Sequence, residues 1–237
     1  MLLIKRMRIA ILVYGLNRSI EITHESINKS ILKPLKENDI EYDMYVHTYS
    51  MSSLYSNVRN NEKDLKIDPN TLQVLNPLHM TIEDQDEFDK TFDISDYNKH
   101  GDIWKNRNVS LKNVIRGLHS LKEAYSSMVV GIKYDGVLVI RPDTLFNNDL
   151  NIGDLKKSIS NNDIYLPGFH SCGGFNDRFA FGSTNRMKSY CLRYNHLLDY
   201  ASKYIVHSEG FLKHIIQNAK NTNIKFMRVR ANGKIHV

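Results

Sequence analysis

The chain has 237 residues, of which 41% are hydrophobic and 24% are charged, with a formal net charge of +6. This composition suits one large globular domain or two small ones and excludes a collagen, a coiled coil or a disordered tail protein, while two cysteines are too few for a disulfide-dense secreted scaffold or a zinc ribbon. The basic residues are dispersed without a nucleic-acid-binding motif, and no apolar run approaches the roughly 18 residues that cross a bilayer, so we expect no nucleic-acid partner and no transmembrane segment.

The first predicted element is a buried parallel strand over residues 8–14, an apolar run that ends at Gly15. A signal peptide would follow such a run with a small-residue cleavage site, whereas Asn17 and Arg18 follow here. We therefore expect a cytoplasmic protein.

A helix and a second strand come next. Residues 19–35 carry apolar side chains at helical spacing after Ser19, which is a suitable N-cap. Residues 42–49 read as a strand, so the first 49 residues predict a βαβ unit. The polar residues 50–68 are expected to form a loop, and residues 72–75 a third strand.

The middle of the chain contains the clearest helix. Residues 81–98 are strongly acidic and are expected to form an exposed insertion. Residues 110–128 place seven apolar side chains on one stripe and predict an amphipathic helix. Residues 134–140 then predict a central strand, with Arg141 and Asp143 directly after it.

The remaining segments continue the alternation. We predict strands over residues 163–167 and 224–230 and helices over residues 185–204 and 209–219, the last capped by Ser208. Alternating strands and helices indicate an α/β fold with a mostly parallel central sheet and helices on both faces. Ligands of such sheets bind outside the carboxyl ends of the strands, so the residues after each strand are the candidates for a site.

The sharpest chemical signal is the sequence VLVIRPDTLF. A buried strand that ends in Arg141 and Asp143 offers a carboxylate beside a fixed cation. Mg²⁺ or Mn²⁺ binds one or two carboxylates together with phosphate oxygens, and an arginine stabilises the same diphosphate. The chain contains neither G-x-G-x-x-G nor a Walker motif, so the phosphate cradle of a dinucleotide enzyme or P-loop kinase is absent.

Six segments carry a more specific resemblance: RIAILVYGLNR, YDMYVHTYS, SLKNVIRGLHSL, YDGVLVIRPD, NDRFAFG and HSEGFL, in this order. As an ordered set over about residues 8–233, they resemble the small GT-A-type glycosyltransferases of large DNA viruses of algae and amoebae and of bacterial surface-polysaccharide clusters. The resemblance implies a single GT-A-like (Rossmann-like) domain over residues 1–237. About residues 1–143 would bind the nucleotide sugar and about residues 144–237 the acceptor.

The resemblance also implies roles for individual residues. The donor would be held by residues at the first two strand ends, at the start of the long helix and after the central strand: Gly15, Asn17, Arg18, Thr48, Tyr49, Arg107, Asn113 and Arg141. In such enzymes an Asp-x-Asp motif binds Mn²⁺ or Mg²⁺. Here Arg141 replaces its first aspartate, which leaves Asp143 as the metal-binding carboxylate, with His236 as a second ligand.

The acceptor side is expected in the glycine-rich segment GFHSCGGFNDRFAFG. An inverting enzyme needs a carboxylate that takes the proton from the acceptor hydroxyl, and Asp177 and Glu209 are the two candidates. Glu209 begins a predicted helix, whose dipole favours the ionised form and lowers basicity, so the pKa argument favours Asp177, whereas the resemblance favours Glu209.

The sequence thus predicts a hexosyltransferase-type glycosyltransferase. It would move a sugar from a nucleoside-diphosphate sugar to a hydroxyl of a glycan or glycoprotein acceptor, with metal assistance and inversion. The alternatives from other classes are a nucleotidyltransferase-like enzyme and a non-catalytic carbohydrate-binding protein on the same fold, since fold alone does not separate them.

Overall fold

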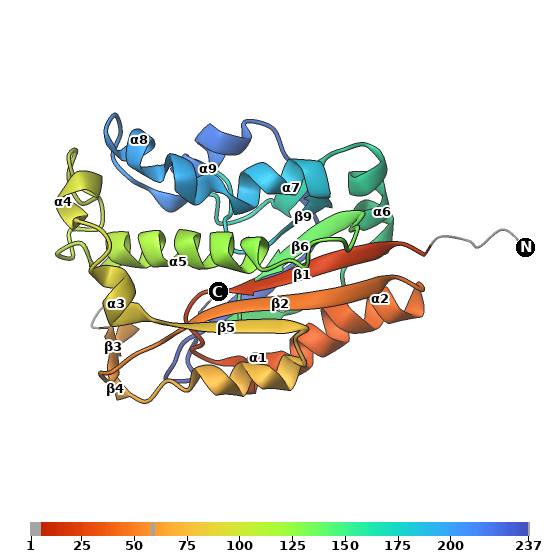
Figure 1. Cartoon of the computed structure of the whole chain (residues 1–237), viewed down its shortest axis with the longest axis horizontal. Coiled ribbons are helices and arrows are strands. Elements are labelled where there is room, and N and C mark those ends of the chain that lie inside the picture. The colour runs from red at the N-terminus through yellow and green to blue at the C-terminus, as the bar shows by residue number, and fades with distance from the viewer. Residues whose placement is uncertain (1–5, 58–59, 237) are drawn as a thin grey trace, which may run out of the picture.

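The centre of the molecule is a seven-stranded sheet. The structure is a computed structural model that describes residues 6–57 and 60–236. The strands of this sheet are β1 (Arg8–Tyr14), β2 (Glu41–Ser50), β5 (His79–Asp84), β6 (Gly136–Ile140), β8 (Ile164–Pro167), β9 (Ala180–Ser183) and β10 (Lys220–Thr222). Their order is β10-β8-β9-β6-β1-β2-β5, and all neighbours are parallel except β9, which runs antiparallel to both β6 and β8 (Figure 1). The α/β class and the mostly parallel sheet are therefore confirmed.

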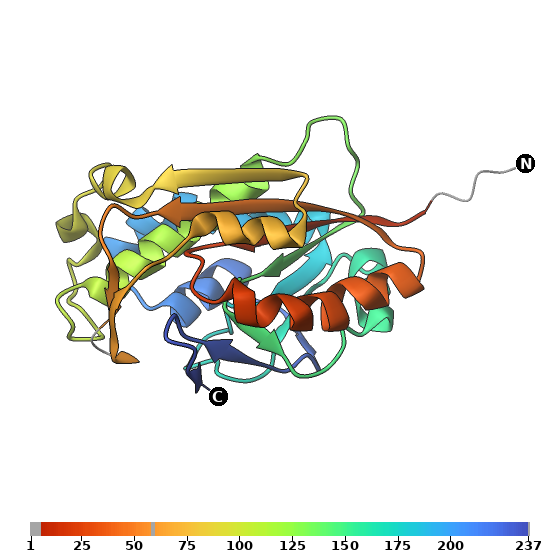
Figure 2. The same ribbon diagram turned by 90° about the horizontal axis from the view of Figure 1, so that it is seen from below.

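Helices cover both faces of this sheet. One face carries α1 (Ile20–Ile27), α2 (Lys33–Glu37) and α6 (Ile152–Ser160), and the other carries α5 (Val109–Ser126), α7 (Thr184–Cys191) and α9 (Ser208–Ile216) (Figures 1 and 2). The side chains of β1 alternate between the two faces of the sheet and pack against both helix layers. Ile9 and Ile11 belong to one core cluster, and Ala10 and Leu12 belong to the other.

A three-stranded sheet adjoins the large one. The strands β7 (Thr144–Phe146), β11 (Phe226–Val229) and β12 (Ile235–His236) form an antiparallel sheet in the order β12-β11-β7. In this sheet Arg228 pairs with both Thr144 and His236, which brings the end of the chain beside the segment that follows β6.

Two expected features of residues 50–75 are wrong. The predicted loop contains a two-stranded hairpin of β3 (Tyr55–Asn57) and β4 (Glu62–Leu65), whose buried Glu62 carboxylate accepts a hydrogen bond from the backbone N–H of Ala231 at 2.6 Å. The predicted third strand is the 3₁₀ helix η3 (Pro69–Leu75). Asp68 caps this helix through the N–H of Asn70, and Pro69 supplies a helical φ at its start.

The acidic segment 81–98 is not an exposed insertion. It contains the edge strand β5 and the short helices α3 (Gln85–Asp89) and α4 (Ile94–Tyr97), with Phe88 and Tyr97 buried. Asp84 and Asp93 cap these two helices, so part of the acidic composition serves helix starts.

The predicted helices differ in detail from the observed ones. The helix over residues 19–35 is confirmed with a wider turn, η1 (Asn28–Leu32), between α1 and α2. The helix over residues 185–204 is divided into α7, η4 (Arg193–His196) and α8 (Leu197–Ala201). Neither predicted serine cap forms: Ser19 donates to the carbonyl oxygen of Val229, and Ser208 donates to Asp177. Within residues 6–57 and 60–236, no helix is both long and apolar enough for a membrane crossing.

Candidate functional site

The carboxyl ends of β1 and β6 lie side by side, as the sequence predicts. The two strands are parallel, with Val13 opposite Ile140. After β1, Gly15 turns the chain with a φ of +93°, and its N–H donates to the buried hydroxyl of Ser120 at 2.8 Å. This turn leads to Arg18, which reaches the segment after β6.

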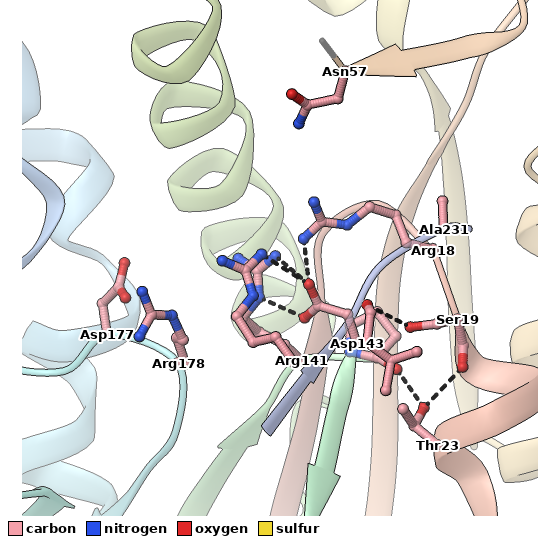
Figure 3. Close-up of polar contacts among 12 residues, drawn as sticks. Arg18, Ser19, Thr23, Asn57, Arg141, Asp143, Asp177, Arg178 and Ala231 are labelled. Carbon is pink, nitrogen blue, oxygen red and sulfur yellow. Dashed lines mark hydrogen bonds and ion pairs between the residues drawn. The ribbon is translucent and has the colours of Figure 1, made fainter. Parts of the chain in front are cut away.

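Asp143 is the centre of an arginine cluster, which we define as Arg18, Arg141 and Arg228. The Asp143 carboxylate accepts Nε of Arg141 at 2.9 Å and its Nη2 at 3.2 Å, Nη2 of Arg228 at 2.9 Å, and Nη2 of Arg18. Figure 3 shows Arg18 and Arg141 converging on this carboxylate. The Asp143 side chain is 1% exposed, and although burial acts in the opposite direction, the three guanidinium groups hold the pKa of Asp143 well below its usual range.

The arginine cluster has more positive charge than Asp143 neutralises. Three guanidinium groups against one carboxylate leave a net charge of +2, and the Nε atoms of Arg18, Arg228 and Arg230 are buried without a hydrogen-bond partner in the described part of the chain. Burial and the neighbouring arginines lower the pKa of Arg228 to about 9, so it remains protonated at neutral pH. Buried donors with surplus positive charge are suited to a phosphate-bearing anion.

The expected metal site does not fit this geometry. A carboxylate offers about four acceptor positions, and Asp143 already accepts four hydrogen bonds from arginines. His236 is exposed on β12 opposite Arg228, and among residues 6–57 and 60–236 no three His, Cys, Asp or Glu side chains are grouped to hold a metal ion. A divalent cation at Asp143 would also meet three guanidinium charges, so we derive no step through Mn²⁺ or Mg²⁺.

The first candidate base, Asp177, is fixed by its neighbours. Its backbone carbonyl accepts the hydroxyl groups of Tyr14 and Tyr190, both at 2.9 Å, and its carboxylate accepts the hydroxyl of Ser208. Burial acts to raise the pKa of Asp177, but Arg178 and the Ser208 hydroxyl outweigh it and lower that pKa. Asp177 is therefore an ionised carboxylate that positions its surroundings and a weak proton acceptor.

The second candidate base, Glu209, has the opposite electrostatic environment. It lies in the first turn of α9, and its carboxylate is 3.5 Å from Nη2 of Arg178 and 3.4 Å from Nε2 of His207. Burial and the negative charge of Asp177 raise the pKa of Glu209. The pKa argument from sequence, which favoured Asp177, is thus reversed, because desolvation and a like charge outweigh the helix dipole.

Tyr14 contacts both the arginine cluster and the backbone of Asp177. The Arg141 guanidinium lies 5.7 Å from the centre of the Tyr14 ring, and the hydroxyl of the same ring donates to the backbone carbonyl oxygen of Asp177. Figure 3 shows Asp177 and Arg178 on one side of Arg141, and the negative charge of Asp177 is among those that raise the pKa of Arg141. The ends of β1 and β6 and the segment before β9 therefore contribute to one site.

Three of the predicted donor contacts, Asn17, Thr48 and Tyr49, are buried, and their contact with a donor remains a prediction. The Asn17 amide donates to Asp68 and Thr71 and so holds η3 against the turn after β1. Tyr49 is buried against α5, where its hydroxyl donates to the carbonyl oxygen of Arg116. Thr48 is fully buried, and its hydroxyl has no hydrogen-bond partner in the described residues.

The two predicted contacts near α5 lie at its exposed start. Asn113 is exposed and accepts Nη1 of Arg116 at 3.1 Å. Arg107 is exposed in the preceding loop with a φ of +57°. α5 begins on the side of the molecule toward which β1 runs, which is also the side of the arginine cluster (Figure 1). Their contact with a donor remains a prediction.

The sequence interpretation missed two residues of the site. Arg228 belongs to the half of the chain expected to bind the acceptor, yet it completes the arginine cluster. A signal for it exists in the segment KFMRVR, where Arg228 and Arg230 lie two residues apart on a predicted strand and therefore share one strand face with the apolar Phe226. His207 begins the segment HSEGFL, in which the sequence interpretation gave a chemical role to Glu209 alone.

Comparisons with known proteins describe only a distant likeness. No protein-family model matches the sequence, and no curated protein matches it. Among solved structures, the chain is similar to the crystal structure of mouse xyloside xylosyltransferase 1 in its apo form. The TM-score is 0.44 and the sequence identity is 10%, over 90% of this chain and 81% of that one. A likeness this distant carries no argument about activity, so the function is argued from the site.

Proposed function

We propose that this protein is a glycosyltransferase that moves a sugar from a nucleoside-diphosphate sugar to a hydroxyl group of a glycan or glycoprotein. The observation that carries the proposal is the arginine cluster, whose surplus positive charge lies at the carboxyl ends of β1 and β6. Beside it lie two carboxylates with pKa values shifted in opposite directions, which is a pattern typical of acid–base sites.

The arginine cluster would stabilise the leaving group. When the bond between the sugar carbon and the phosphate oxygen breaks, negative charge develops on the departing nucleoside diphosphate. The net charge of +2 on Arg18, Arg141 and Arg228 with Asp143 matches such an anion. Preorganised charge of this kind is usually the largest contribution to catalysis. In this proposal the three guanidinium groups neutralise the negative charge of the diphosphate, which is the role that the sequence interpretation gave to a metal ion.

Glu209 would act as the general base. Its raised pKa makes it the better proton acceptor of the two carboxylates, while Asp177 stays ionised and holds Ser208. An attack by the activated hydroxyl on the face opposite the leaving diphosphate inverts the configuration at the sugar carbon. Asp177 and Arg178 would then orient Glu209 from the segment before β9.

Calorimetric titration with UDP and GDP, in the presence of EDTA, tests the diphosphate site. The wild-type protein is expected to bind at least one of them, and Arg228→Gln is expected to weaken that binding about 10- to 100-fold, since a hydrogen bond to a charged group contributes about 1.5–3 kcal/mol. Arg186→Gln is the matched control, because Arg186 lies on α7 and donates to the carbonyl oxygen of Asn218. Binding by neither nucleotide, or equal binding by Arg228→Gln, would contradict the proposal.

Transfer assays with Glu209→Gln test the role of Glu209 as the general base. We expect Glu209→Gln to lower kcat by about 10²- to 10⁴-fold with nucleotide binding retained. Because the pKa of Glu209 is raised, the acidic limb of the wild-type kcat/KM profile should lie at higher pH than that of an ordinary carboxylate, and it should disappear in Glu209→Gln. A product with the donor's own anomeric configuration in NMR would exclude the inverting mechanism.

A further inference from the structure

The single tryptophan of the chain lies next to the candidate base. The ring of Trp104 is 5.8 Å from the imidazole of His207, centre to centre, and the two planes are inclined by 30°. Nε2 of His207 is in turn 3.4 Å from the Glu209 carboxylate. The side chain of His207 thus lies between the Trp104 ring and the Glu209 carboxylate.

The loop that carries Trp104 has a fixed conformation. The Asp102 carboxylate accepts the backbone N–H groups of Trp104 at 3.0 Å, Asn106 at 2.9 Å and Asn108 at 2.9 Å. These bonds outweigh desolvation and lower the pKa of Asp102. His100 contacts the carbonyl oxygen of Ser202 at 3.0 Å, which ties the loop to the segment before α9.

The backbone of this loop is also strained. Lys105, Arg107 and Asn108 have positive φ angles of 49°, 57° and 64°. Such non-glycine conformations cost on the order of 1–3 kcal/mol each and persist where the surroundings determine them, often at ligand sites. The position of Trp104 is therefore specified by the fold and is not that of a freely moving surface side chain.

Trp104 comes after Glu209 in the series of contacts that starts at the arginine cluster, so we assign it to the side of Glu209 where the acceptor would bind. From the arginine cluster, the contacts run through Tyr14 to the backbone carbonyl of Asp177, and the next residue, Arg178, contacts Glu209. Trp104 follows Glu209 in this series, because His207 contacts both of them. A molecule that presents a hydroxyl to Glu209 from the side away from the diphosphate would cover the Trp104 ring. A half-buried aromatic face beside polar groups suits a sugar ring, which has an apolar C–H face and a rim of hydroxyl groups.

We propose that Trp104 and His207 form a platform for the sugar ring whose hydroxyl receives the transferred sugar, so that the acceptor is a glycan. This inference rests on the proposed function and names the acceptor class of the same site. A protein acceptor without sugar would leave the Trp104 ring uncovered, and a nucleobase stacked on Trp104 would place the donor on this side instead.

The only tryptophan is its own probe. With excitation at a wavelength that tyrosine does not absorb, emission comes from Trp104 alone. We expect saturable changes in this emission with at least one of a panel of methyl glycosides of glucose, galactose, mannose and xylose and the disaccharide lactose, and none with UDP or GDP. His207→Ala should weaken the glycoside response at least about tenfold, which corresponds to 1.4 kcal/mol. His214→Ala is the matched control, because His214 packs on Tyr200 and Tyr204.

Kinetics complete the test. Trp104→Ala should raise the KM for the acceptor about tenfold or more, Trp104→Phe should raise it less, and both should leave donor hydrolysis and nucleotide binding unchanged. No response to any glycoside, a response to UDP or GDP, or an unchanged acceptor KM in Trp104→Ala would overturn the platform. Nucleotide binding without a glycoside response removes this inference alone. A glycoside response without nucleotide binding removes the proposed function and, with it, the acceptor role of the platform, and leaves only a sugar-binding site.

Discussion

Asp143 determines the charge balance of the site. From the sequence alone, Asp143→Asn is expected to lose most of the activity while the fold survives, because the carboxylate is expected to bind a metal. In the structure it is the counter-ion of three buried guanidinium groups. We therefore expect Asp143→Asn to lower the free energy of unfolding by about 3–5 kcal/mol, the usual cost of breaking a buried ion pair, in urea unfolding followed by circular dichroism.

Added anion and an exposed pair provide the controls for Asp143→Asn. Inorganic phosphate should restore part of the lost stability, because the anion takes the place of the missing carboxylate. Asp199→Asn removes a carboxylate that pairs with Lys203 at the exposed surface and should leave the free energy of unfolding nearly unchanged. If Asp143→Asn were as stable as the wild type, the arginine cluster would not depend on this carboxylate.

At the scale of elements, the docking of the glycine-rich segment on α9 positions Glu209. A Cβ on Gly174 would lie 1.9 Å from the carbonyl oxygen of Glu209, and the neighbouring Phe175 N–H donates to that same oxygen at 3.0 Å. Gly174→Ala must therefore displace either the segment or the start of α9. We expect a loss of about 1–3 kcal/mol of stability, typical of overpacking, together with reduced transfer, measured by thermal unfolding and product formation.

A second glycine serves as the reference for Gly174→Ala. Gly117 lies in α5, and a Cβ there would meet no atom within 4 Å. Alanine is favoured over glycine inside a helix by up to about 1 kcal/mol, so Gly117→Ala should raise the melting temperature. A Gly174→Ala variant that gains stability in the same way would show that the close approach to Glu209 does not constrain the site.

The elements that the sequence predicts are those whose signal is local. The strands predicted at residues 8–14 and 134–140 contain the continuous apolar runs 9–14 and 137–140, and their pairing brings Arg18 to Asp143. Arg228 reaches the same carboxylate only because β11 pairs with β7. No local sequence pattern predicts this pairing. Residues 72–75 read as a strand from their apolar content, but Asp68 and Pro69 start a 3₁₀ helix there.

At the scale of the whole molecule, burial explains most of what sequence reasoning misjudged. The order of pKa values at Asp177 and Glu209 depends on desolvation and on the charges that folding brings together, which cannot be read from helix position. The fold class, in contrast, follows from the alternation of apolar strands and amphipathic helices and needs no such detail. The sequence therefore locates the edge of the sheet where the site lies and leaves the roles of its residues to the structure.

The buried His47 is expected to make the stability of the whole fold depend on pH. His47, at the end of β2, is 2% exposed, and its ring lies 3.0 Å from the Ser120 hydroxyl on α5 and 3.4 Å from the Glu83 carboxylate on β5. Burial and the neighbouring His119 lower the pKa of His47 to about 3. His47 is therefore neutral in the folded protein across the physiological pH range.

This shift predicts a loss of stability in acid. An unfolded histidine binds its proton near pH 6.5, whereas folded His47 does so only near pH 3, so between these values the unfolded chain holds more protons and stability falls as the pH falls. Over the whole window the loss is on the order of 3–5 kcal/mol. Urea unfolding at a series of pH values from neutral to about 4 should show this slope in the wild type and in His79→Gln, which alters an exposed histidine of β5. His47→Gln should flatten it, and an equal slope in His47→Gln would assign the acid sensitivity to other groups.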